Sequence, residues 1–232
     1  RLTMKKLLLI LILPITLLLV NCGECECDDL QPVDPVDPVD PIDPIVSIYT
    51  YVPDNNFEIA LIQMGVDNTL NDTVLTAAID TITYLDVGSK NISDLTGIEN
   101  FTALTDLICS FNQLTSLDVS NNIALELLEC RNNQIDSLDL DNNTSLISLQ
   151  CRNNQLRRLD VSNNIALEFL ECRINWLTSL DLRNGNNTNL NLRSDSNPYL
   201  FCIDVDNVAW SNSFSNWIIN PMSFYSEDCG VK

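Results

Sequence analysis

LTDLICSFNQLTSLDVSNNIA (104–124) is followed without a gap by LELLECRNNQIDSLDLDNNTS (125–145), LISLQCRNNQLRRLDVSNNIA (146–166) and LEFLECRINWLTSLDLRNGNN (167–187). These four stretches are copies of one 21-residue unit. A fixed period of this length predicts a solenoid, because a single unit cannot bury its apolar edge without a neighbour stacked on each side. The rest of the chain is therefore expected to anchor, cap or present this stack.

A cysteine and an asparagine each recur at a fixed place in every copy. Counting places from Leu104, Leu125, Leu146 and Leu167, apolar residues occupy places 1, 4, 6, 11, 14 and 16. The asparagine at place 9 is expected to hydrogen-bond otherwise unpaired backbone groups of its own and the next coil. The cysteine at place 6 is expected to be a buried thiol, because stacking spaces these sulfurs about 5 Å apart in a line, whereas a metal gathers its ligands around one point. The predicted structural ladders are Cys109, Cys130, Cys151 and Cys172, and Asn112, Asn133, Asn154 and Asn175.

A looser 22-residue unit, residues 82–103, precedes the four copies and gives five repeats over residues 82–187. Its Lys90-Asn91 pair stands one place out of phase, so its turn should differ. The pattern L-x-x-L-x-C-x-x-N-x-L resembles the leucine-rich repeat. With VPDNNFEIAL (52–61) ahead and a cysteine-bearing tail behind, the chain resembles bacterial leucine-rich-repeat surface lipoproteins with internalin-like caps. That resemblance implies an α/β solenoid with a concave parallel β-sheet, usually working by binding another macromolecule.

The start of the chain has the layout of an export signal. Lys5-Lys6 and the apolar run 7–20 predict a lipoprotein signal peptide over residues 1–21. The run is 14 residues long, short of the ~20 that a membrane-spanning helix needs, and an uncleaved anchor is the alternative. Leu19-Val20-Asn21-Cys22 resembles the lipobox of bacterial lipoproteins, which implies lipidation of Cys22; an ordinary secretory signal is the other reading. The predicted location is the cell envelope, as a surface-exposed outer-membrane lipoprotein.

Residues 22–47 read as an acidic linker that contains four Val/Ile-Asp-Pro triplets. Proline at every third residue forbids helix and favours the extended polyproline II form, so we expect a spacer that holds the following domain away from a membrane. The state of Cys25 and Cys27 stays open between a local disulfide, free thiols and a bridge to another chain.

Composition excludes several functions. The formal net charge of −20 argues against nucleic acid as a partner. The chain has no histidine, which removes histidine-based acid–base catalysis, histidine-activated nucleophiles and histidine-ligated zinc. We therefore predict a non-catalytic protein without a cofactor, and a monomeric ectodomain held at a membrane by its lipid.

The repeats are expected to lie between two caps. In the predicted helical N-terminal cap, residues 48–81, a helix begins at the Asp/Asn cluster after Pro53 and ends at Gly65, with Phe57 and Met64 among its inward residues, and a second short helix follows Asp72. In the predicted C-terminal cap, residues 188–232, the period breaks. There we expect strand remnants at 189–192 and 202–205, a disulfide that joins Cys202 to Cys229, and an apolar cover formed by Trp210, Phe214, Trp217, Ile218 and Phe224.

Stacked carboxylates recur at place 15 as Asp118, Asp139, Asp160 and Asp181. Because like charges repel, these groups must accept hydrogen bonds from backbone N–H groups, be partly protonated or share cations. Local turn capping is the favoured interpretation, and calcium, both here and in the oxygen-rich loop 66–72, is the alternative.

Function is expected on places 2, 3, 5, 7 and 8, which should face outward from the concave strands. The predicted ligand-binding residues are Arg131, Arg152 and Arg173 at place 7, Glu129, Gln150 and Glu171 at place 5, and the apolar residues Phe111, Phe169, Ile174 and Trp176. Arginine and aromatic side chains are enriched at binding hot spots, so we predict a protein or glycan ligand. The alternative is a charge-compensated face with Arg131–Glu129 and Arg152–Glu171 pairs, on a passive structural coat or spacer protein.

Overall fold

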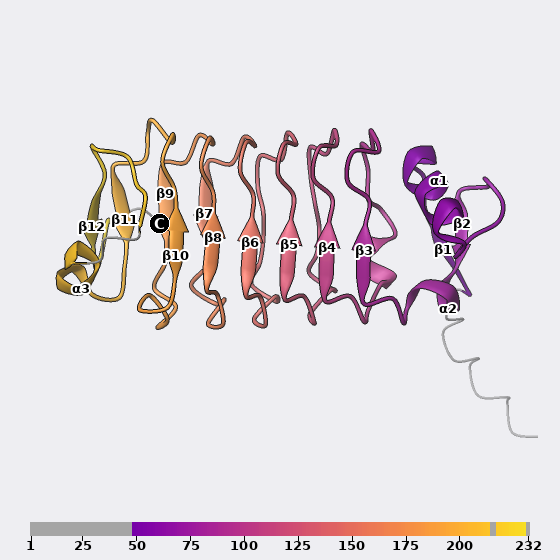
Figure 1. The fold of residues 1–232 in the computed structure, drawn as a ribbon, viewed down its shortest axis with the longest axis horizontal. Helices are drawn as coiled ribbons and strands as arrows, with labels where there is room; N and C mark the ends of the chain where they lie inside the picture. The colour runs from indigo at the N-terminus through magenta and orange to yellow at the C-terminus, as the bar shows by residue number, and fades with distance from the viewer. Residues whose placement is uncertain (1–47, 214–216, 231–232) are drawn as a thin grey trace, which may run out of the picture. The chain divides into compact units, whose positions relative to one another are not determined.

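The computed structural model describes residues 48–213 and 217–230. The predicted signal peptide 1–21, the linker 22–47 and the lipidation residue Cys22 lie outside the described residues, as does Phe214. Figure 1 shows one stack of coils between residue 48 and the carboxyl end, with short helices at both ends. No helix within the described ranges is long and apolar enough to cross a membrane. The helices are α1 (Asn55–Met64), α2 (Thr76–Ile79), α3 (Val208–Ser213) and the 3-10 helix η1 (Ile98–Asn100).

One parallel sheet runs along the whole stack and confirms the predicted solenoid. Places 3 to 5 of each unit form a strand, and the residue at place 4 is buried between outward neighbours. Neighbouring strands pair in register without slippage, for example Leu128 opposite Leu149. We call this the first sheet; its six strands are β3 (Tyr84–Asp86), β4 (Asp106–Ile108), β5 (Leu127–Glu129), β6 (Ser148–Gln150), β8 (Phe169–Glu171) and β10 (Asn191–Arg193).

A second parallel sheet, which we did not predict, begins in the third copy and takes places 13 to 15 of the third and fourth copies. Its inward residues at places 14 and 16, such as Leu159 and Val161, are buried beside an outward aspartate at place 15. Because strand spacing is about 4.8 Å in both sheets, the two sides of the coils from the third copy onward are similar in width, which favours a shallow arc there. The second sheet contains β7 (Arg158–Asp160), β9 (Ser179–Asp181), β11 (Cys202–Asp204) and β12 (Phe224–Ser226).

The N-terminal helix packs on the first coil much as its sequence predicts. An antiparallel pair, β1 (Tyr49–Tyr51) and β2 (Thr73–Leu75), flanks α1, and α2 follows β2 directly. Phe57 is fully buried and its ring lies 6.2 Å from that of Phe101 in the first coil. Met64 departs from the prediction, since it is 43% exposed at the last turn of α1.

Asp54 joins this helix to the first coil. One carboxylate oxygen accepts hydrogen bonds from the N–H groups of Asn56 and Phe57 at the start of α1, 2.9 and 3.0 Å long. The other accepts from Ser93 N, Ser93 Oγ and Asp94 N at 2.8, 2.8 and 3.1 Å. Burial acts to raise the pKa of this carboxyl, but the hydrogen bonds outweigh burial and the pKa lies below the ordinary 3.8.

Asp54→Ala is expected to destabilise the N-terminal end by about 2 kcal/mol, because it removes a helix cap and leaves Ser93 and Asp94 N–H groups without an acceptor. Hydrogen exchange should show α1 and residues 93–94 opening together. Asp54→Asn retains only one of the two oxygens, so the stability of its N-terminal end should lie between that of Asp54→Ala and that of the wild type. Loss of protection in α1 alone would show that Asp54 only caps the helix.

The coils continue past Asn187, where the sequence period breaks. Strand β10 pairs in parallel with β8, and β11 pairs with β9, so residues 191–204 form a further coil of the same two sheets. Asn197 takes the position of a place-9 asparagine, and its Nδ2 donates to the carbonyls of Cys172 and Ser194. Strand β12 then adds to β11 as the last strand of the second sheet.

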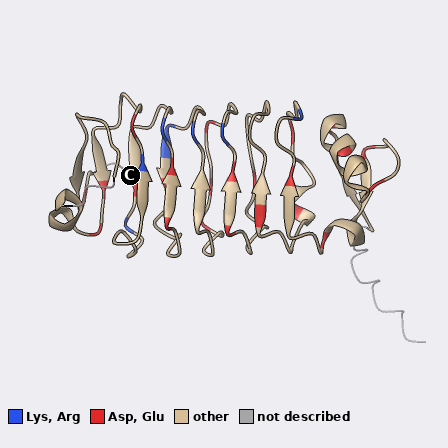
Figure 2. Ribbon diagram, in the orientation of Figure 1, with Lys and Arg blue, Asp and Glu red and all other residues tan. Residues whose placement is uncertain are grey.

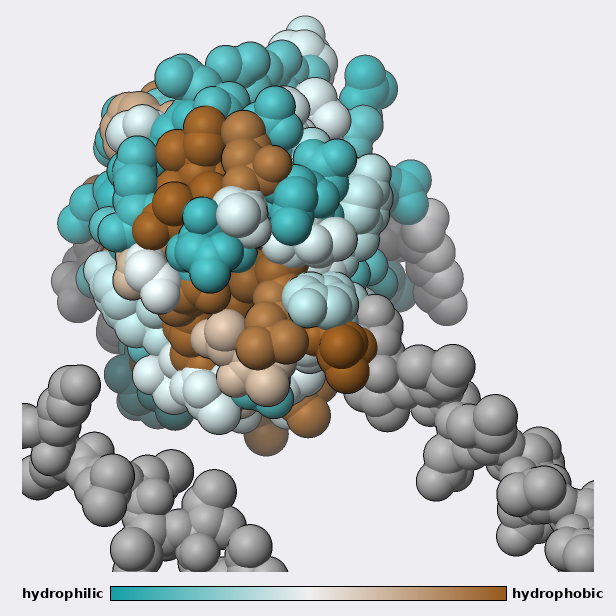
Figure 3. Space-filling view, turned by 90° about the vertical axis from the view of Figure 1, so that its right-hand side faces the viewer, coloured by the Kyte–Doolittle hydropathy of each residue, from teal (hydrophilic) through white to brown (hydrophobic). Residues whose placement is uncertain are grey.

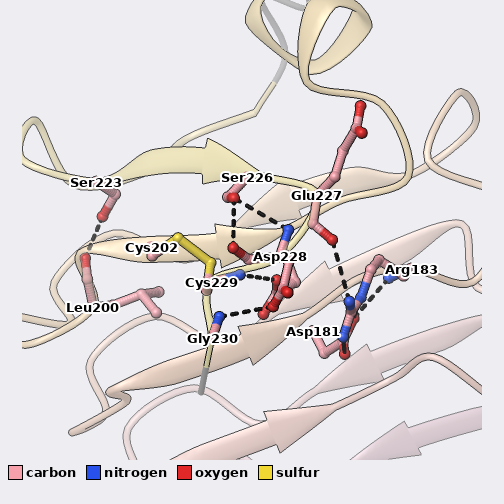
Figure 4. Close-up of a disulfide and its surroundings, with 11 residues drawn as sticks. Asp181, Arg183, Leu200, Cys202, Ser223, Ser226, Glu227, Asp228, Cys229 and Gly230 are labelled. Carbon is pink, nitrogen blue, oxygen red and sulfur yellow. Dashed lines mark hydrogen bonds and ion pairs between the residues drawn. A yellow bond between two sulfur atoms is a disulfide. The ribbon is translucent and has the colours of Figure 1, made fainter. Parts of the chain in front are cut away.

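The predicted disulfide between Cys202 and Cys229 is confirmed, and it joins β11 to the segment after β12 (Figure 4). Arg183 reaches the same region, since its Nη1 donates to the carbonyl of Glu227. Among the predicted cover residues, Trp217 is buried, whereas Ile218 and Phe224 are half exposed. Both of these residues lie on strands or bridges whose outward side faces solvent.

Candidate ligand-binding surface

The outer face of the first sheet carries most of the predicted ligand-binding residues. At place 5, Glu129 and Gln150 lie side by side on β5 and β6, and Gln150 Nε2 donates to Glu129 Oε1 over 3.0 Å. Glu171 follows on β8 but is only 5% exposed, so little of its surface is available to a ligand. Figure 2 shows most of the basic positions on the C-terminal half of the stack, on and after its first-sheet strands.

The arginines at place 7 differ in their partners. Arg131 Nη2 lies 2.6 Å from Glu129 Oε2, as the charge-compensated reading predicts. Arg173 Nη2 instead lies 3.1 Å from Asp195 Oδ2, on the following coil. The predicted Arg152–Glu171 pair is not formed, and Arg152 makes no ion pair with any described residue. The guanidinium group of Arg152, whose donors have a fixed planar geometry, therefore has no ion-pair partner among the described residues at the centre of this face.

Place 8 has a left-handed backbone in each of the four copies. Asn132 and Asn153 adopt φ values of 54° and 56°, which asparagine tolerates. Phe111 and Ile174 occupy the same place with φ values of 58° and 56°, although bulky and β-branched side chains are strained there. Both are also exposed, Phe111 by 58% and Ile174 by 38%. The fold therefore carries two strained apolar residues where asparagine serves it better.

Phe169 and Trp176 do not join these arginines in one cluster. Phe169 lies on β8 under the guanidinium of Arg193, whose carbon is 5.8 Å from the ring centroid. Trp176 stands at place 10 and lines a groove at the side of the stack, where each coil passes from the first sheet to the second. Trp176 was predicted to lie with the residues of the first sheet; it is only two positions from Ile174 in the chain, but it lies on the side of the stack.

The cysteine ladder lies inside the core. All four thiols are fully buried and free, and none is near enough to other metal-binding side chains for the described residues to hold a cluster that could bind a metal ion. Burial raises the pKa of every one of them, to about 12 for Cys130, because a thiolate loses its hydration there. These groups are consequently poor nucleophiles in the folded protein.

The asparagine ladder connects each coil to the coil before it, rather than to the next one as predicted. Asn133 Nδ2 donates to the carbonyls of Cys130 in its own coil and Cys109 in the preceding coil, both at 3.0 Å. Its Oδ1 accepts from Leu114 N at 3.1 Å. Asn112, Asn154 and Asn175 repeat these contacts in their coils. The predicted structural role is therefore confirmed, with the direction corrected.

A second asparagine ladder, which we did not predict, lies at place 19. Asn122, Asn143 and Asn164 are at most 1% exposed. Asn143 Nδ2, for example, donates to Val119 O at 3.0 Å and to Asn122 O at 2.9 Å. The signal was present in the sequence, because asparagine occupies place 19 in the first three copies.

The aspartates at place 15 cap local turns. Each accepts a hydrogen bond from the backbone N–H two residues later, at 2.9 to 3.1 Å. Hydrogen bonding by Ser120, through its side chain and its backbone, lowers the pKa of Asp118. The favoured interpretation of turn capping is confirmed.

Apolar side chains also gather at the N-terminal end of the stack, which Figure 3 shows facing the viewer. Ile59, Leu70 and Leu75 are each between 39% and 53% exposed there. A helix was predicted directly after Asp72, but Thr73–Leu75 form a strand, and alternation turns Leu75 outward.

Comparison with known proteins agrees with this architecture. No family model matches the sequence. Over 76 residues the chain is 38% identical to internalin J of Listeria monocytogenes serotype 4b (strain F2365), a match that spans 33% of this chain and 8% of internalin J.

Two of the solved structures that are similar to the chain come from internalins. The functional domain of InlJ from Listeria monocytogenes, which includes a cysteine ladder, matches 74% of this chain and 43% of its own length, with 31% identity and a TM-score of 0.58. Internalin C2 from Listeria monocytogenes strain 4b F2365 matches 80% of this chain and 92% of its own length, with 17% identity and a TM-score of 0.57. The described residues thus form a leucine-rich-repeat solenoid with parallel β-sheets, and the chain is similar in sequence and fold to internalins.

Proposed function

We propose that this chain is a non-catalytic binding module, displayed on a bacterial surface, that holds a protein ligand on the outer face of the first sheet. The observation that carries the proposal is the strain at Phe111 and Ile174. Each residue adopts a strained left-handed backbone and exposes apolar surface at place 8. The second and third copies have asparagine at this place, Asn132 and Asn153, and asparagine suits the same turn.

The charged residues between these two apolar positions supply specificity. Arg152 stands uncompensated among its described neighbours, while Arg131 and Arg173 are held by ion pairs to Glu129 and Asp195. Pre-oriented guanidinium groups flanked by apolar anchors match the composition of protein-binding hot spots. Display at the surface is proposed from the lipobox-like stretch ending at Cys22 and from the extended linker that follows.

Changing Arg131, Arg152 and Arg173 together to Ser is expected to abolish ligand retention on a protein array while the melting temperature stays nearly the same. Serine is the natural place-7 residue of the first copy, Ser110, so the fold accepts it. The two partly exposed ion pairs that are lost should each contribute only about 0–1 kcal/mol to folding.

Arg183→Ser provides the matched control, because it removes an arginine and its ion pair to Asp181 from the second sheet. This control should retain every ligand of the wild-type chain. Equal binding by the triple variant would exclude the first sheet as the site. A wild-type chain that retains nothing on protein and glycan arrays would instead support the passive coat.

A further inference from the structure

A groove of about 660 Å³ at the side of the stack lies apart from the first-sheet surface. It is open to solvent, and its two aromatic side chains, Trp176 and Tyr199, are 49% and 60% exposed. Its lining residues are Arg157, Arg158, Trp176, Thr178, Pro198 and Tyr199.

These lining residues are departures from the repeat. Place 10 is glutamine in the first three copies and tryptophan only at Trp176. Places 12 and 13 read Thr-Ser or Asp-Ser in the other copies and Arg-Arg only at Arg157-Arg158. In the next coil, Pro198 and Tyr199 separate the ladder residue Asn197 from buried Leu200, where each copy has a single residue between the corresponding positions. Three departures in three neighbouring coils therefore meet in one groove.

The fold gains little from these residues. The backbone N–H of Trp176 donates to Leu156 O, as Gln155 N donates to Ile135 O one coil earlier, so stacking does not depend on the indole. Arg157 and Arg158 are exposed and make no ion pair with a described residue, on a chain whose net charge is −20. Two free guanidinium groups next to two exposed aromatic rings form a surface suited to a ligand with both apolar faces and an acid group.

We propose that this groove binds an oligosaccharide that carries a carboxylate, such as a uronic acid unit. The C–H face of a sugar ring packs on an aromatic ring, and the carboxylate accepts paired hydrogen bonds from a guanidinium group. The groove volume lies within the range of small-ligand sites, which is roughly 300–1,000 Å³. This inference goes beyond the proposed function and concerns a different surface.

Two features favour a sparsely charged saccharide over other acidic ligands. An extended peptide binds by adding a strand to free backbone groups, but Trp176 N and Thr178 N already donate to Leu156 O and Arg157 O. A densely sulfated chain would meet strong general repulsion from the acidic protein. A saccharide with one carboxylate on every one or two sugar units can place a carboxylate at the arginines without that high charge density.

The test is an NMR titration of the ¹⁵N-labelled mature protein with a hyaluronan tetrasaccharide, which carries one carboxylate on every second sugar. The chain has three tryptophans, and the Trp176 indole signal is assigned by its absence in Trp176→Gln. We expect this signal to shift on titration, and both Trp176→Gln and the double variant Arg157→Thr/Arg158→Ser to weaken binding about tenfold or more.

All three substitutions install residues that neighbouring copies hold at the same places, so unchanged melting temperatures are expected. The triple variant Arg131/Arg152/Arg173→Ser should bind the tetrasaccharide normally, which separates this site from the first-sheet surface. Neutral chitotetraose should bind about tenfold more weakly than hyaluronan. Hexaglutamate is titrated in parallel and stands for an acidic peptide ligand. The proposal is overturned if hyaluronan does not shift the Trp176 signal, if chitotetraose binds as well as hyaluronan, or if only hexaglutamate shifts the signal.

Discussion

Asn154→Ala is expected to lower the free energy of unfolding by about 3 kcal/mol, because it leaves the buried Ile135 N–H without an acceptor and takes one of two amide donors from each of two buried carbonyls. Asn154 Nδ2 donates to Cys130 O and Cys151 O at 3.0 and 3.1 Å, and its Oδ1 accepts from Ile135 N at 3.1 Å. Urea denaturation of the variant and the wild type measures the difference. The loss weakens two coils at once, because the hydrogen bonds of Asn154 join its own coil to the preceding one.

Asn121→Ala is the matched control, because Asn121 is exposed and precedes the buried ladder residue Asn122. Its unfolding free energy should stay within about 0.5 kcal/mol of wild type. A comparably small effect of Asn154→Ala would mean that solvent or a relaxed backbone satisfies Ile135 N–H and that one amide donor suffices for each carbonyl; the ladder would then not stabilise the stack.

Alkaline pH is expected to unfold the stack through the cysteine ladder. Burial raises the pKa of the four thiols above the ordinary 9.0, to about 12 for Cys130, so they stay protonated in the folded protein. When the pKa of a thiol is higher in the folded protein than in the unfolded chain, the thiol stabilises the folded protein. This stabilisation is fully present below the pKa of the unfolded chain, and it is lost as the pH rises through the pKa of the folded protein. In that window the protein should lose about 1.4 kcal/mol of unfolding free energy per pH unit for each thiol, and about 5.5 kcal/mol for all four.

The comparison that isolates the thiols is Cys130→Ala against wild type, with denaturation curves recorded at pH 8, 9.5 and 11. The variant starts from lower stability because it contains a small cavity, but about a quarter of the part of the alkaline slope that the thiols contribute should disappear. Tyr225, which is partly buried and whose pKa burial also raises, is present in both proteins and cancels in the difference. Parallel slopes in the two proteins would show that the ladder thiols do not control alkaline unfolding.

The fold was predictable where the sequence period and the burial period coincide. Cysteine at place 6 and asparagine at place 9 recur in every copy, so each residue had one structural explanation. The second sheet was missed although leucine at place 14, aspartate at place 15 and an apolar residue at place 16 show strand alternation. The coil after Asn187 was missed because one added residue shifts Leu192 and Asn197 out of the 21-residue count.

The candidate site was less predictable, because side-chain partners depend on neighbouring coils rather than on the unit itself. Arg131 pairs within its own strand and turn, two residues from Glu129, and that pair followed from the sequence. Arg173 pairs with Asp195 one coil later, across the point where the period fails. The left-handed backbone at Phe111 and Ile174 was obscured by their apolar side chains, although Asn132 and Asn153 at the same place indicate it.

The disulfide at the end of the stack determines how this chain bears mechanical load. Tension applied beyond Cys229 passes through the disulfide directly to Cys202 in β11. The residues between the two cysteines, including β12, then carry none of that tension and cannot be peeled off singly. Detachment from this end has to separate β11 from β9 first, so the first rupture under force occurs one strand further into the protein than the end of the second sheet.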